Sequence, residues 1–493
     1  MRRLVASFKK TQSRPGDISG SLPINKHLPM INSDKPRDEC GIFAVYNYEQ
    51  GVEKRSLNAA QTVSLGLQAL QHRGQESAGM TFRKDGQISS YKGMGLVGNC
   101  FSWKRLRETE SKTVLGHVRY STTGSSTFNN IQPLIVHSSE GYTLAVAHNG
   151  NLSNSAALWQ NYLDMGHIFQ TESDTEILIA FLFQNRKHGL QEAVTKLMYL
   201  AEGAFSVVAM TNDEMVAFRD PRGFRPLCIG RLNNGYVFSS ETCALNNIGA
   251  EFEREIKPGE IVSVRDDRMS TLQVPPLKPS FCIFEYIYFA RPDSDLNGIN
   301  VHQARKNIGA RLATQIKSEL DIIVPSPDSG VSAAMGMSEA SGIPFDWGIY
   351  RNPYGGRTFI NPGQESREMA ARLKFSPISP LIKGKRVAVV DDSLVRGTTA
   401  RQLSMMLRKA GAREVHFFIA SPPYRHPCYY GIDIPLAVDL ACSSEDTDKF
   451  ANTISCDSLS YNTIEDLYAG IGMDRNNYCS ACFDGNYPVK QRC

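Results

Sequence analysis

The sequence predicts two successive domains of mixed class, α+β in the first half and α/β in the second. From Cys40 to about Val274, short apolar strand-like runs outnumber helical patterns. Beyond the proline-rich residues 275–279, the expected linker, buried strands alternate with helices. A chain of 493 residues with 41% hydrophobic content has room for two or three domains. We therefore expect segments 1–39, 40–274 and 275–493.

Apolar periodicity locates the main elements of both halves. Leucine, isoleucine and phenylalanine recur at helical spacing in two segments of the first half, 58–71 and 175–188. Continuous apolar runs predict strands at 205–210, 236–239, 321–324 and 386–390. The last two runs are typical of buried parallel strands, so ligands are expected at their carboxyl ends.

The charge of the chain is concentrated in residues 1–39. The net charge is +4, and this segment, with eight Lys and Arg residues against four acids, accounts for all of it. The remainder is neutral by the same count, so no nucleic-acid surface is predicted. No apolar run approaches the roughly 20 residues of a membrane span, and no continuous apolar stretch near the start indicates secretion. We expect a cytoplasmic protein without a membrane partner.

The first sixteen residues are basic, lack acids and include Ser7 and Ser13. Such a segment is compatible with an organellar transit peptide or with a simple propeptide. The propeptide is the favoured interpretation, and an organellar location follows only from the other one.

Cys40 heads an apolar run, Gly41–Tyr46, and four polar motifs follow it in order. These motifs are His72-Arg73-Gly74-Gln75-Glu76, Gly116-His117-Val118-Arg119-Tyr120-Ser121, His148-Asn149-Gly150-Asn151-Leu152 and Ser173-Asp174-Thr175-Glu176. The ordered set resembles the glutaminase domain of the N-terminal-nucleophile amidotransferases, which implies a four-layer sandwich. In that family the cysteine is the first residue of the mature enzyme. The resemblance therefore implies that residues 1–39 are removed.

The chemistry of a cysteine nucleophile supports this expectation. A free thiol is mostly protonated near neutral pH and needs a base. An α-amine, with a pKa of roughly 7.7–8.0, suits that task, whereas a peptide nitrogen does not. A buried cysteine at the start of a strand is the common alternative, but four ordered motifs favour catalysis. The resemblance further implies that Arg73, Arg119 and Asp174 hold the charged ends of glutamine, and that Asn149 and Gly150 form the oxyanion hole.

The second half carries its own motif at residues 389–399. An apolar strand ends in Asp391 and Asp392, and a loop containing Gly397 leads into a helical pattern. Backbone N–H groups of such a loop cradle phosphate, and adjacent acids hold ribose hydroxyls or Mg²⁺. A solvated strand end with an N-cap is the alternative. The motif resembles the signature of type I phosphoribosyltransferases, which bind 5-phosphoribosyl-1-pyrophosphate. The residues expected to bind it are Asp391, Asp392, Ser393, Arg396, Gly397, Thr398 and Thr399.

Two further loops fit the same substrate. Residues 324–330 follow a strand, and Ser329 is expected to approach Mg²⁺ together with Asp391 and Asp392. Tyr350–Arg372 is long, polar and rich in Gly, Pro and Arg, as expected of a mobile lid. Its segment 356–360 resembles the closing loop of the glutamine phosphoribosylpyrophosphate amidotransferases. Closure would exclude water from the reacting centre.

The two halves in this order resemble the glutamine phosphoribosylpyrophosphate amidotransferase family over about residues 38–490. The resemblance implies glutamine hydrolysis at the first site, internal transfer of ammonia, and displacement of pyrophosphate at the second site to give phosphoribosylamine, the first committed step of purine synthesis. It also implies inhibition by AMP or GMP and a homo-oligomer, expected to be a tetramer. A cradle for a 5′-phosphate at residues 393–399 would accept the nucleotide phosphate as well.

Eleven cysteines in a chain without secretion signals indicate catalytic or metal roles rather than disulfides. Cys479 and Cys482 form a CxxC pair, and one branch of the resembled family holds a [4Fe–4S] cluster on four cysteines placed like Cys282, Cys428, Cys479 and Cys482. Tetrathiolate Zn²⁺ is the alternative. Cys442 and Cys456 are possible substitutes. Cys100, Cys228 and Cys243 are expected to be small side chains buried in the core. The terminal Cys493 is expected to have no functional role.

Two other functions compete with this interpretation. Other glutamine amidotransferases, such as the sugar isomerase or asparagine synthetase types, share the first half but lack the motif at 389–399. A non-catalytic purine-sensing regulator could keep the phosphoribosyltransferase fold. Such a regulator would have no reason to keep Cys40 with a full glutaminase domain and a complete lid.

Overall fold

The computed structural model describes residues 40–48, 57–84, 86–120, 127–353, 374–432, 447–472 and 474–489. Three expectations lie outside these residues: the removed segment 1–39, most of the lid at 350–372, and any role of Cys442 or Cys493.

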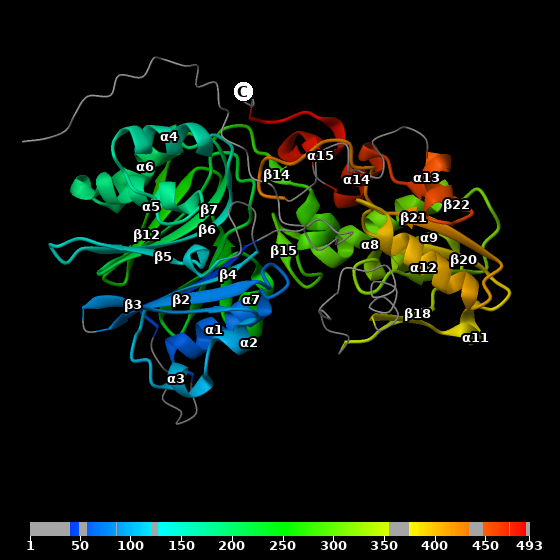
Figure 1. Ribbon diagram of the computed structural model, residues 1–493, viewed down its shortest axis with the longest axis horizontal. Coiled ribbons are helices and arrows are strands. Elements are labelled where there is room, and N and C mark those ends of the chain that lie inside the picture. The colour runs from blue at the N-terminus through cyan, green and yellow to red at the C-terminus, as the bar shows by residue number, and fades with distance from the viewer. Residues whose placement is uncertain are drawn as a thin grey trace, which may run out of the picture. The chain divides into compact units, whose positions relative to one another are not determined.

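The first half contains two antiparallel sheets that face one another (Figure 1). Within the described residues, one sheet has seven strands in the order β11-β9-β10-β1-β4-β2-β3, and the other has six in the order β13-β12-β8-β7-β6-β5. The strands of the first sheet are β1 (Gly41–Tyr46), β2 (Ser77–Lys84), β3 (Gln87–Met94), β4 (Val114–Arg119), β9 (Cys228–Leu232), β10 (Gly235–Ser239) and β11 (Glu251–Glu255). Those of the second are β5 (Leu134–His137), β6 (Thr143–Leu152), β7 (Gly203–Thr211), β8 (Glu214–Arg219), β12 (Glu260–Arg265) and β13 (Arg268–Gln273).

Alternation along the strands explains why helices cover both outer faces. In β1, Ile42 and Ala44 point into the core between the sheets, whereas Phe43 and Val45 pack against helices on the other side. Both faces are thus apolar, and each needs a cover. The helices on the β1 side are α1 (Ala59–Ala69), α2 (Val97–Cys100), α3 (Trp103–Arg107) and α7 (Thr242–Ile248). Those on the β6 side are α4 (Ser155–Asp164), α5 (Thr175–Gln184) and α6 (Leu190–Leu200), and the short turns η1 (Phe128–Asn130) and η2 (Arg186–His188) complete this half. The predicted four-layer sandwich is confirmed.

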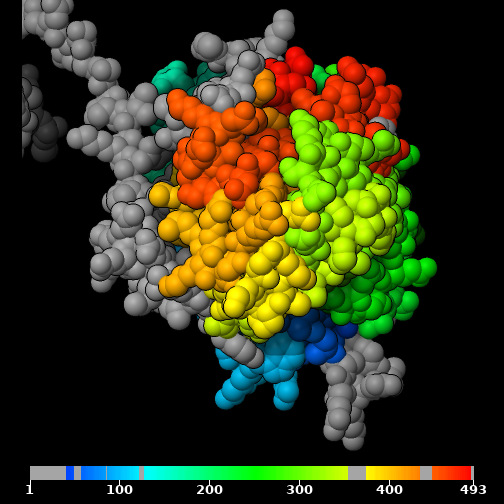
Figure 2. All heavy atoms as spheres, turned by 90° about the vertical axis from the view of Figure 1, so that its right-hand side faces the viewer, coloured from blue at the N-terminus to red at the C-terminus, as the bar shows by residue number. Residues whose placement is uncertain are grey.

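The second half contains a parallel sheet, as predicted. Among the described residues its strand order is β17-β20-β21-β22, and all three pairings are parallel. Its strands are β17 (Ile322–Pro325), β20 (Arg386–Asp391), β21 (Glu414–Ile419) and β22 (Ser458–Tyr461). Helices α8 (Val301–Leu312), α9 (Val331–Ser341) and α14 (Ile464–Ile471) cover one face, and α11 (Ser379–Ile382), α12 (Thr398–Lys409) and α13 (Thr447–Thr453) cover the other. Figure 2 looks onto this half, whose residues, coloured from green to red, make up most of that face.

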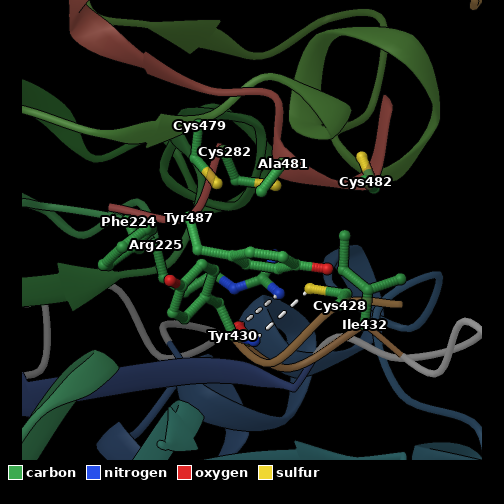
Figure 3. Close-up of a pocket in the computed structure, with 10 residues that line it drawn as sticks. All are labelled: Phe224, Arg225, Cys282, Cys428, Tyr430, Ile432, Cys479, Ala481, Cys482 and Tyr487. Atoms are coloured by element: carbon green, nitrogen blue, oxygen red, sulfur yellow. Dashed lines mark hydrogen bonds between the residues drawn. The ribbon is translucent and has the colours of Figure 1, made fainter. Parts of the chain in front are cut away.

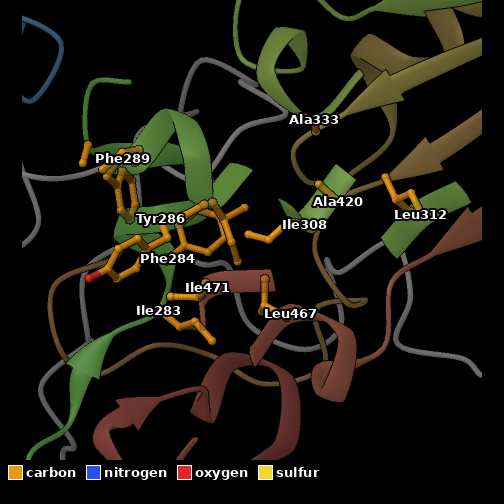
Figure 4. Packing of buried hydrophobic residues seen from close by; sticks show 14 of the residues in the cluster. Ile283, Phe284, Tyr286, Phe289, Ile308, Leu312, Ala333, Ala420, Leu467 and Ile471 are labelled. Atoms are coloured by element: carbon orange, nitrogen blue, oxygen red, sulfur yellow. The ribbon is translucent and has the colours of Figure 1, made fainter. Parts of the chain in front are cut away.

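The segment that follows the first half is built into the core of the second. Ile283, Phe284 and Tyr286 pack with Ile308 of α8 and Leu467 of α14 (Figure 4). The remaining small elements of this half are β14 (Phe281–Cys282), η3 (Glu285–Phe289), β15 (Asp295–Leu296), β16 (Ile299–Asn300), η4 (Ala313–Gln315), β18 (Ile349–Arg351), β19 (Phe375–Pro377), η6 (Arg475–Asn477), β23 (Tyr478–Cys479) and α15 (Ala481–Asp484).

Contacts group residues 34–493 as one unit, so the domain boundary near residue 274 stays a prediction. Across the part of the chain that the structure describes, no helix combines the length and apolar character needed to cross a membrane.

Candidate active sites and a four-cysteine pocket

Cys40 lies directly before β1 and is buried. Its thiol donates to the Tyr120 carbonyl at 3.6 Å, beside the end of β4. Its own carbonyl accepts a 3.1 Å hydrogen bond from Nε of Arg73. The predicted nucleophile is therefore held from both its side chain and its backbone.

Arg73 is buried among carboxylates. Its guanidinium donates to Glu241, and also to both carboxylate oxygens of Glu285 at 3.0 and 3.1 Å. Burial disfavours its charge, but Glu285 and Glu241 raise its pKa, so it stays a cation. These contacts give Arg73 a part in holding Cys40. Its expected grip on glutamine stays a prediction.

Glu241 is the acceptor at which several segments meet. Its Oε1 lies 2.7 Å from Nε2 of His72, and its Oε2 accepts from the Ser294 hydroxyl at 2.6 Å and from the backbone N–H of Arg291 at 2.9 Å. Burial alone would raise the pKa of this carboxyl, but His72 and Arg73 hold it well below its ordinary value. Glu241 and Glu285 belong to no motif, so sequence reasoning missed both.

The predicted oxyanion hole lies on β6, in the sheet that faces β1. The side-chain nitrogen of Asn149 is buried and has no hydrogen-bond partner among the described residues. Gly150 has φ +143°, and a Cβ there would lie 2.0 Å from the Ala204 carbonyl oxygen, so only glycine fits. A buried donor without an acceptor is what an oxyanion site requires.

The other two predicted glutamine-binding residues sit at strand and helix ends. Arg119 is buried at the end of β4. Asp174 precedes α5, and its carboxylate accepts from the backbone N–H of Leu152 at 2.9 Å, which ties the end of β6 to α5. Their contact with glutamine stays a prediction.

A buried polar network that sequence reasoning missed supports β6. The Gln132 side chain accepts from the His148 N–H at 2.7 Å and donates to the Thr175 hydroxyl at 3.0 Å. His117 lies 3.1 Å from the His148 carbonyl, and burial lowers its pKa to about 3, so it is neutral. The network fixes the strand that carries Asn149. His117, His148 and Thr175 belong to the motifs described in the sequence analysis. That membership was the sequence signal that could have identified the network.

The phosphoribosyl motif has the expected strand–loop–helix form. Asp391 ends β20, and Asp392 follows it, accepting a hydrogen bond from the Ser393 hydroxyl. Gly397 caps α12 with φ +80°, and a Cβ there would lie 2.5 Å from Phe450. Arg396, Thr398 and Thr399 flank this glycine at the N-terminus of the helix.

Ser329 and Asp392 line one small pocket. The expectation that both approach the same Mg²⁺ requires them to lie this close together. Its other lining residues are Ile287, Arg305, Ile308, Ala333 and Ala420. Arg305, which sequence reasoning missed, is buried and donates to the carbonyls of Tyr286 and Ala290, both at 2.8 Å. Burial lowers its pKa to about 10, so it remains positive near neutral pH.

Four cysteines from three separate parts of the sequence line a single pocket (Figure 3). Cys282 and Cys479 are opposite residues of the parallel pair β14–β23, and Cys428 and Cys482 complete the lining. Cys282, Cys479 and Cys482 are free thiols, and the sulfur of Cys428 accepts a hydrogen bond from the Tyr430 N–H at 3.3 Å. In Figure 3, Cys282 and Cys479 lie next to one another, with Cys428 below them and Cys482 to their right. No three His, Cys, Asp or Glu residues in the described ranges are grouped as a metal ion would need.

The other described cysteines lie elsewhere. Cys228 and Cys243 are buried and Cys100 is half-buried. Cys456 donates to the Ser458 carbonyl at 3.2 Å and packs in the core around α12, so it does not line the pocket.

Together, the fold and these sites define a glutamine amidotransferase domain joined to a phosphoribosyltransferase-type sheet. The family described as a glutamine amidotransferase domain matches residues 117–247. The amidophosphoribosyltransferase of Bacillus subtilis is 43% identical over 458 residues, covering 92% of this chain and 94% of the relative. That of Methanocaldococcus jannaschii is 43% identical over 469 residues, covering 92% of this chain and 98% of the relative.

Solved structures agree with the sequence comparison. The glutamine phosphoribosylpyrophosphate amidotransferase of B. subtilis, solved with ADP and GMP, matches with a TM-score of 0.85 at 42% identity, covering 92% of this chain and 98% of that one. This chain belongs to the amidophosphoribosyltransferase family. It is an enzyme that uses glutamine to convert phosphoribosyl pyrophosphate to phosphoribosylamine, the first step of purine synthesis. The predicted activity is confirmed, and the competing interpretations as another amidotransferase or a regulator fall away.

The contacts of Glu241 predict a large effect of its replacement. Glu241→Gln should lower the free energy of unfolding by about 3–5 kcal/mol, because it leaves Arg73 with an incomplete set of buried carboxylates. Chemical denaturation measures this loss. The matched control is Glu253→Gln, which removes the half-exposed partner of Arg231 and should cost about 1 kcal/mol or less. Equal losses in the two variants would contradict the role of Glu241.

Proposed function

We propose that glutamine is hydrolysed at Cys40 and that the released ammonia reacts with phosphoribosyl pyrophosphate at Asp391 and Asp392. The observation that carries this proposal is the buried contact of Arg73 with both the Cys40 carbonyl and Glu285. Glu285 lies in η3, which also borders the pocket of Asp392 through Ile287. One short segment therefore touches both proposed centres.

At the first centre, the Cys40 thiolate would attack the glutamine amide carbon. After removal of residues 1–39, the free α-amine of Cys40 would take the thiol proton and deliver it to the amide nitrogen as the C–N bond breaks and ammonia leaves. Water would then hydrolyse the γ-glutamyl thioester, which releases glutamate and restores the Cys40 thiol. The unpartnered Asn149 amide and the Gly150 N–H would stabilise the oxyanion. Arg73, Arg119 and Asp174 would hold the charged ends of glutamine.

This mechanism predicts separable activities. Cys40→Ser should abolish glutamine-dependent pyrophosphate release and leave ammonia-dependent release unchanged, because the second centre does not need the thiol. N-terminal sequencing of the active enzyme should begin at Cys40. An active enzyme that still carries residues 1–39 would refute the proposed base.

At the second centre, Asp391 and Asp392 would hold the ribose hydroxyls, and the N-terminus of α12 would bind the 5′-phosphate with Ser393, Arg396, Gly397, Thr398 and Thr399. The oxygen donors of Ser329, Asp391 and Asp392 fit Mg²⁺, which when bound would neutralise the pyrophosphate leaving group. Closure of the lid at 350–372 would exclude water from the reacting carbon.

The pocket between η3 and Asp392 suits the transfer of ammonia. Ile287, Ile308, Ala333 and Ala420 offer apolar walls, and the buried cation of Arg305 disfavours entry of ammonium. Neutral ammonia, the nucleophile that the reaction needs, meets no such barrier. These features support an internal route that ends at the second centre.

Removal of the two acids should stop the second reaction. In Asp391→Asn/Asp392→Asn, pyrophosphate release from either glutamine or ammonia should be lost, while glutamine hydrolysis at Cys40 persists. The double replacement keeps side-chain size and removes only charge. Ammonia-dependent release at the wild-type rate would refute the assignment.

Purine nucleotides are proposed to inhibit this enzyme. The B. subtilis relative was solved with ADP and GMP, and the phosphate cradle at residues 393–399 would bind the phosphate of AMP or GMP in place of the substrate. Inhibition by AMP or GMP should therefore be competitive with phosphoribosyl pyrophosphate. If the enzyme stays fully active with AMP and also with GMP, each at a concentration far above that of the substrate, this proposal is contradicted.

The four-cysteine pocket is proposed to hold a [4Fe–4S] cluster. Three buried thiols and the half-buried thiol of Cys428 line one space and supply the ligand number and type that such clusters need. A single Zn²⁺ bound by the four thiolates, each about 2.3 Å from the metal, is the alternative. The cluster would join residues from the start, middle and end of the second half, so its role would be structural.

Metal content distinguishes the two alternatives. Anaerobically purified protein should be brown and contain about four irons per chain. Air oxidation should remove the colour and inactivate the enzyme slowly. A colourless, active protein with one zinc per chain would instead establish the tetrathiolate site.

Location and assembly are also proposals. A cytoplasmic protein whose residues 1–39 are a propeptide is proposed, and the basic first sixteen residues, which lack acids, support an organellar transit peptide as the alternative. A homo-oligomer, expected to be a tetramer, can be measured by light scattering.

A further inference from the structure

The four-cysteine pocket lies against the glutaminase centre rather than apart from it. Phe224 and Arg225, from the first half, line the pocket together with the cysteines. Ala204 of β7 packs in one cluster with Phe224, Tyr430 and Cys479. In β6, Gly150 is paired with Phe205 and Asn151 with Ala204. The strand that carries the predicted oxyanion hole is thus one strand away from the pocket wall.

Arg225 begins a chain of buried charges that ends at the nucleophile. Its guanidinium lies 3.5 Å from Glu285 and donates to the Tyr430 carbonyl at 2.9 Å (Figure 3). Glu285 accepts from Arg73 at 3.0 Å, and Arg73 donates to the Cys40 carbonyl at 3.1 Å. Arg225, Glu285 and Arg73 are all buried. Moving one member therefore leaves the next with an unbalanced charge.

A second contact joins the segment of Cys428 to the oxyanion strand. The Asn151 side chain donates to the Tyr429 carbonyl at 3.1 Å. Gly431 has φ +100°, and a Cβ there would lie 3.2 Å from Nη2 of Arg225 and 3.3 Å from the Gly150 carbonyl carbon. The backbone after Cys428 is therefore wedged between Arg225 and Gly150. No side chain fits in that space without displacement.

We propose that Arg225 is a positioning residue for glutamine hydrolysis, which transmits the order of the four-cysteine pocket to Cys40 through Glu285 and Arg73. The inference rests on the proposed reaction at Cys40 but not on the identity of the group that fills the pocket. Disorder of the pocket should then impair the glutaminase centre before the phosphoribosyl centre. The buried cation also faces the thiolates of any bound cluster, whose negative charge it would balance.

The test compares two buried arginines in the full-length protein. Arg225→Gln should lower kcat for glutamine-dependent pyrophosphate release about tenfold or more, with little change in KM, because the nucleophile is misplaced while the substrate contacts remain. Ammonia-dependent release should stay within about twofold of wild type. Arg225→Lys should restore part of the rate, since it keeps the charge but not both contacts. The control is Arg219→Gln, which removes a buried arginine that donates to the carbonyls of Ile256 and Gly223.

A glycine pair provides a second test that leaves every charge in place. Gly431→Ala should lower glutamine use in the same way as Arg225→Gln. Gly384→Ala should not, because Gly384 also has positive φ, +77°, but nothing lies near its Cβ position. Both variants place an alanine at a positive φ, where a Cβ strains the backbone. Only the alanine at position 431 would crowd Arg225 and Gly150.

The rate at which iodoacetamide alkylates Cys40 measures the same effect without catalytic turnover. Mass spectrometry of the Cys40 peptide follows this rate. It should change in Arg225→Gln and Gly431→Ala and not in the two controls. Equal loss of both activities in Arg225→Gln, or an equal effect of Arg219→Gln, would overturn the inference. If wild-type protein shows neither activity, the proposed function fails, and unchanged alkylation in Arg225→Gln would then overturn the inference by itself.

Discussion

The buried guanidinium of Arg73 is the constraint on which the arrangement of this enzyme depends. A buried cation is tolerated only when it is fully paired, and the carboxylates that pair it come from Glu241 in the first half and Glu285 beyond the linker. It also donates to the carbonyl of Cys40. The side chain of Arg73 thus both positions the nucleophile and joins the two halves. Neither half alone offers Arg73 a complete set of partners.

The two sheet types place their chemistry differently. In the antiparallel sandwich, the residues proposed to act on glutamine lie on the facing sheets, beside β1 and on β6, with polar networks behind them. In the parallel sheet, the neighbouring strands β17 and β20 run in the same direction. The acids and the phosphate loop therefore lie together at the carboxyl ends of these strands. The segment 283–289 runs between them and contributes Glu285 to one centre and Ile287 to the pocket of the other.

Local signals made much of this structure predictable. The helix at 58–71 was predicted from its apolar spacing, and α1 begins after Asn58, which caps it. The helix at 175–188 was predicted one turn too long, because its last residues form the separate turn η2. The run at 386–390 became β20 with its two acids at the tip, since a continuous apolar run bounded by polar residues leaves few alternatives. The fold class followed from the change of pattern near residue 275.

Long-range partners could not be predicted in the same way. Glu241, Glu285, Arg225 and Gln132 are single polar residues without motif spacing, and only the fold brings them together. The convergence of Cys282 and Cys479, about 200 residues apart, follows from a two-residue parallel pairing that no local pattern indicates. Family resemblance suggested that convergence. Resemblance also assigned Arg73 to glutamine, and this role stays a prediction.

The central claim is that Arg73 and Glu285 act as one unit that joins the halves and holds Cys40. A double-mutant cycle with Arg73→Gln, Glu285→Gln and the double variant tests this most directly, with the free energy of unfolding and the rate of glutamine hydrolysis as readouts. The account predicts a coupling energy of about 1–3 kcal/mol, with the double variant little worse than either single one. Additive losses, within about 0.5 kcal/mol, would contradict it.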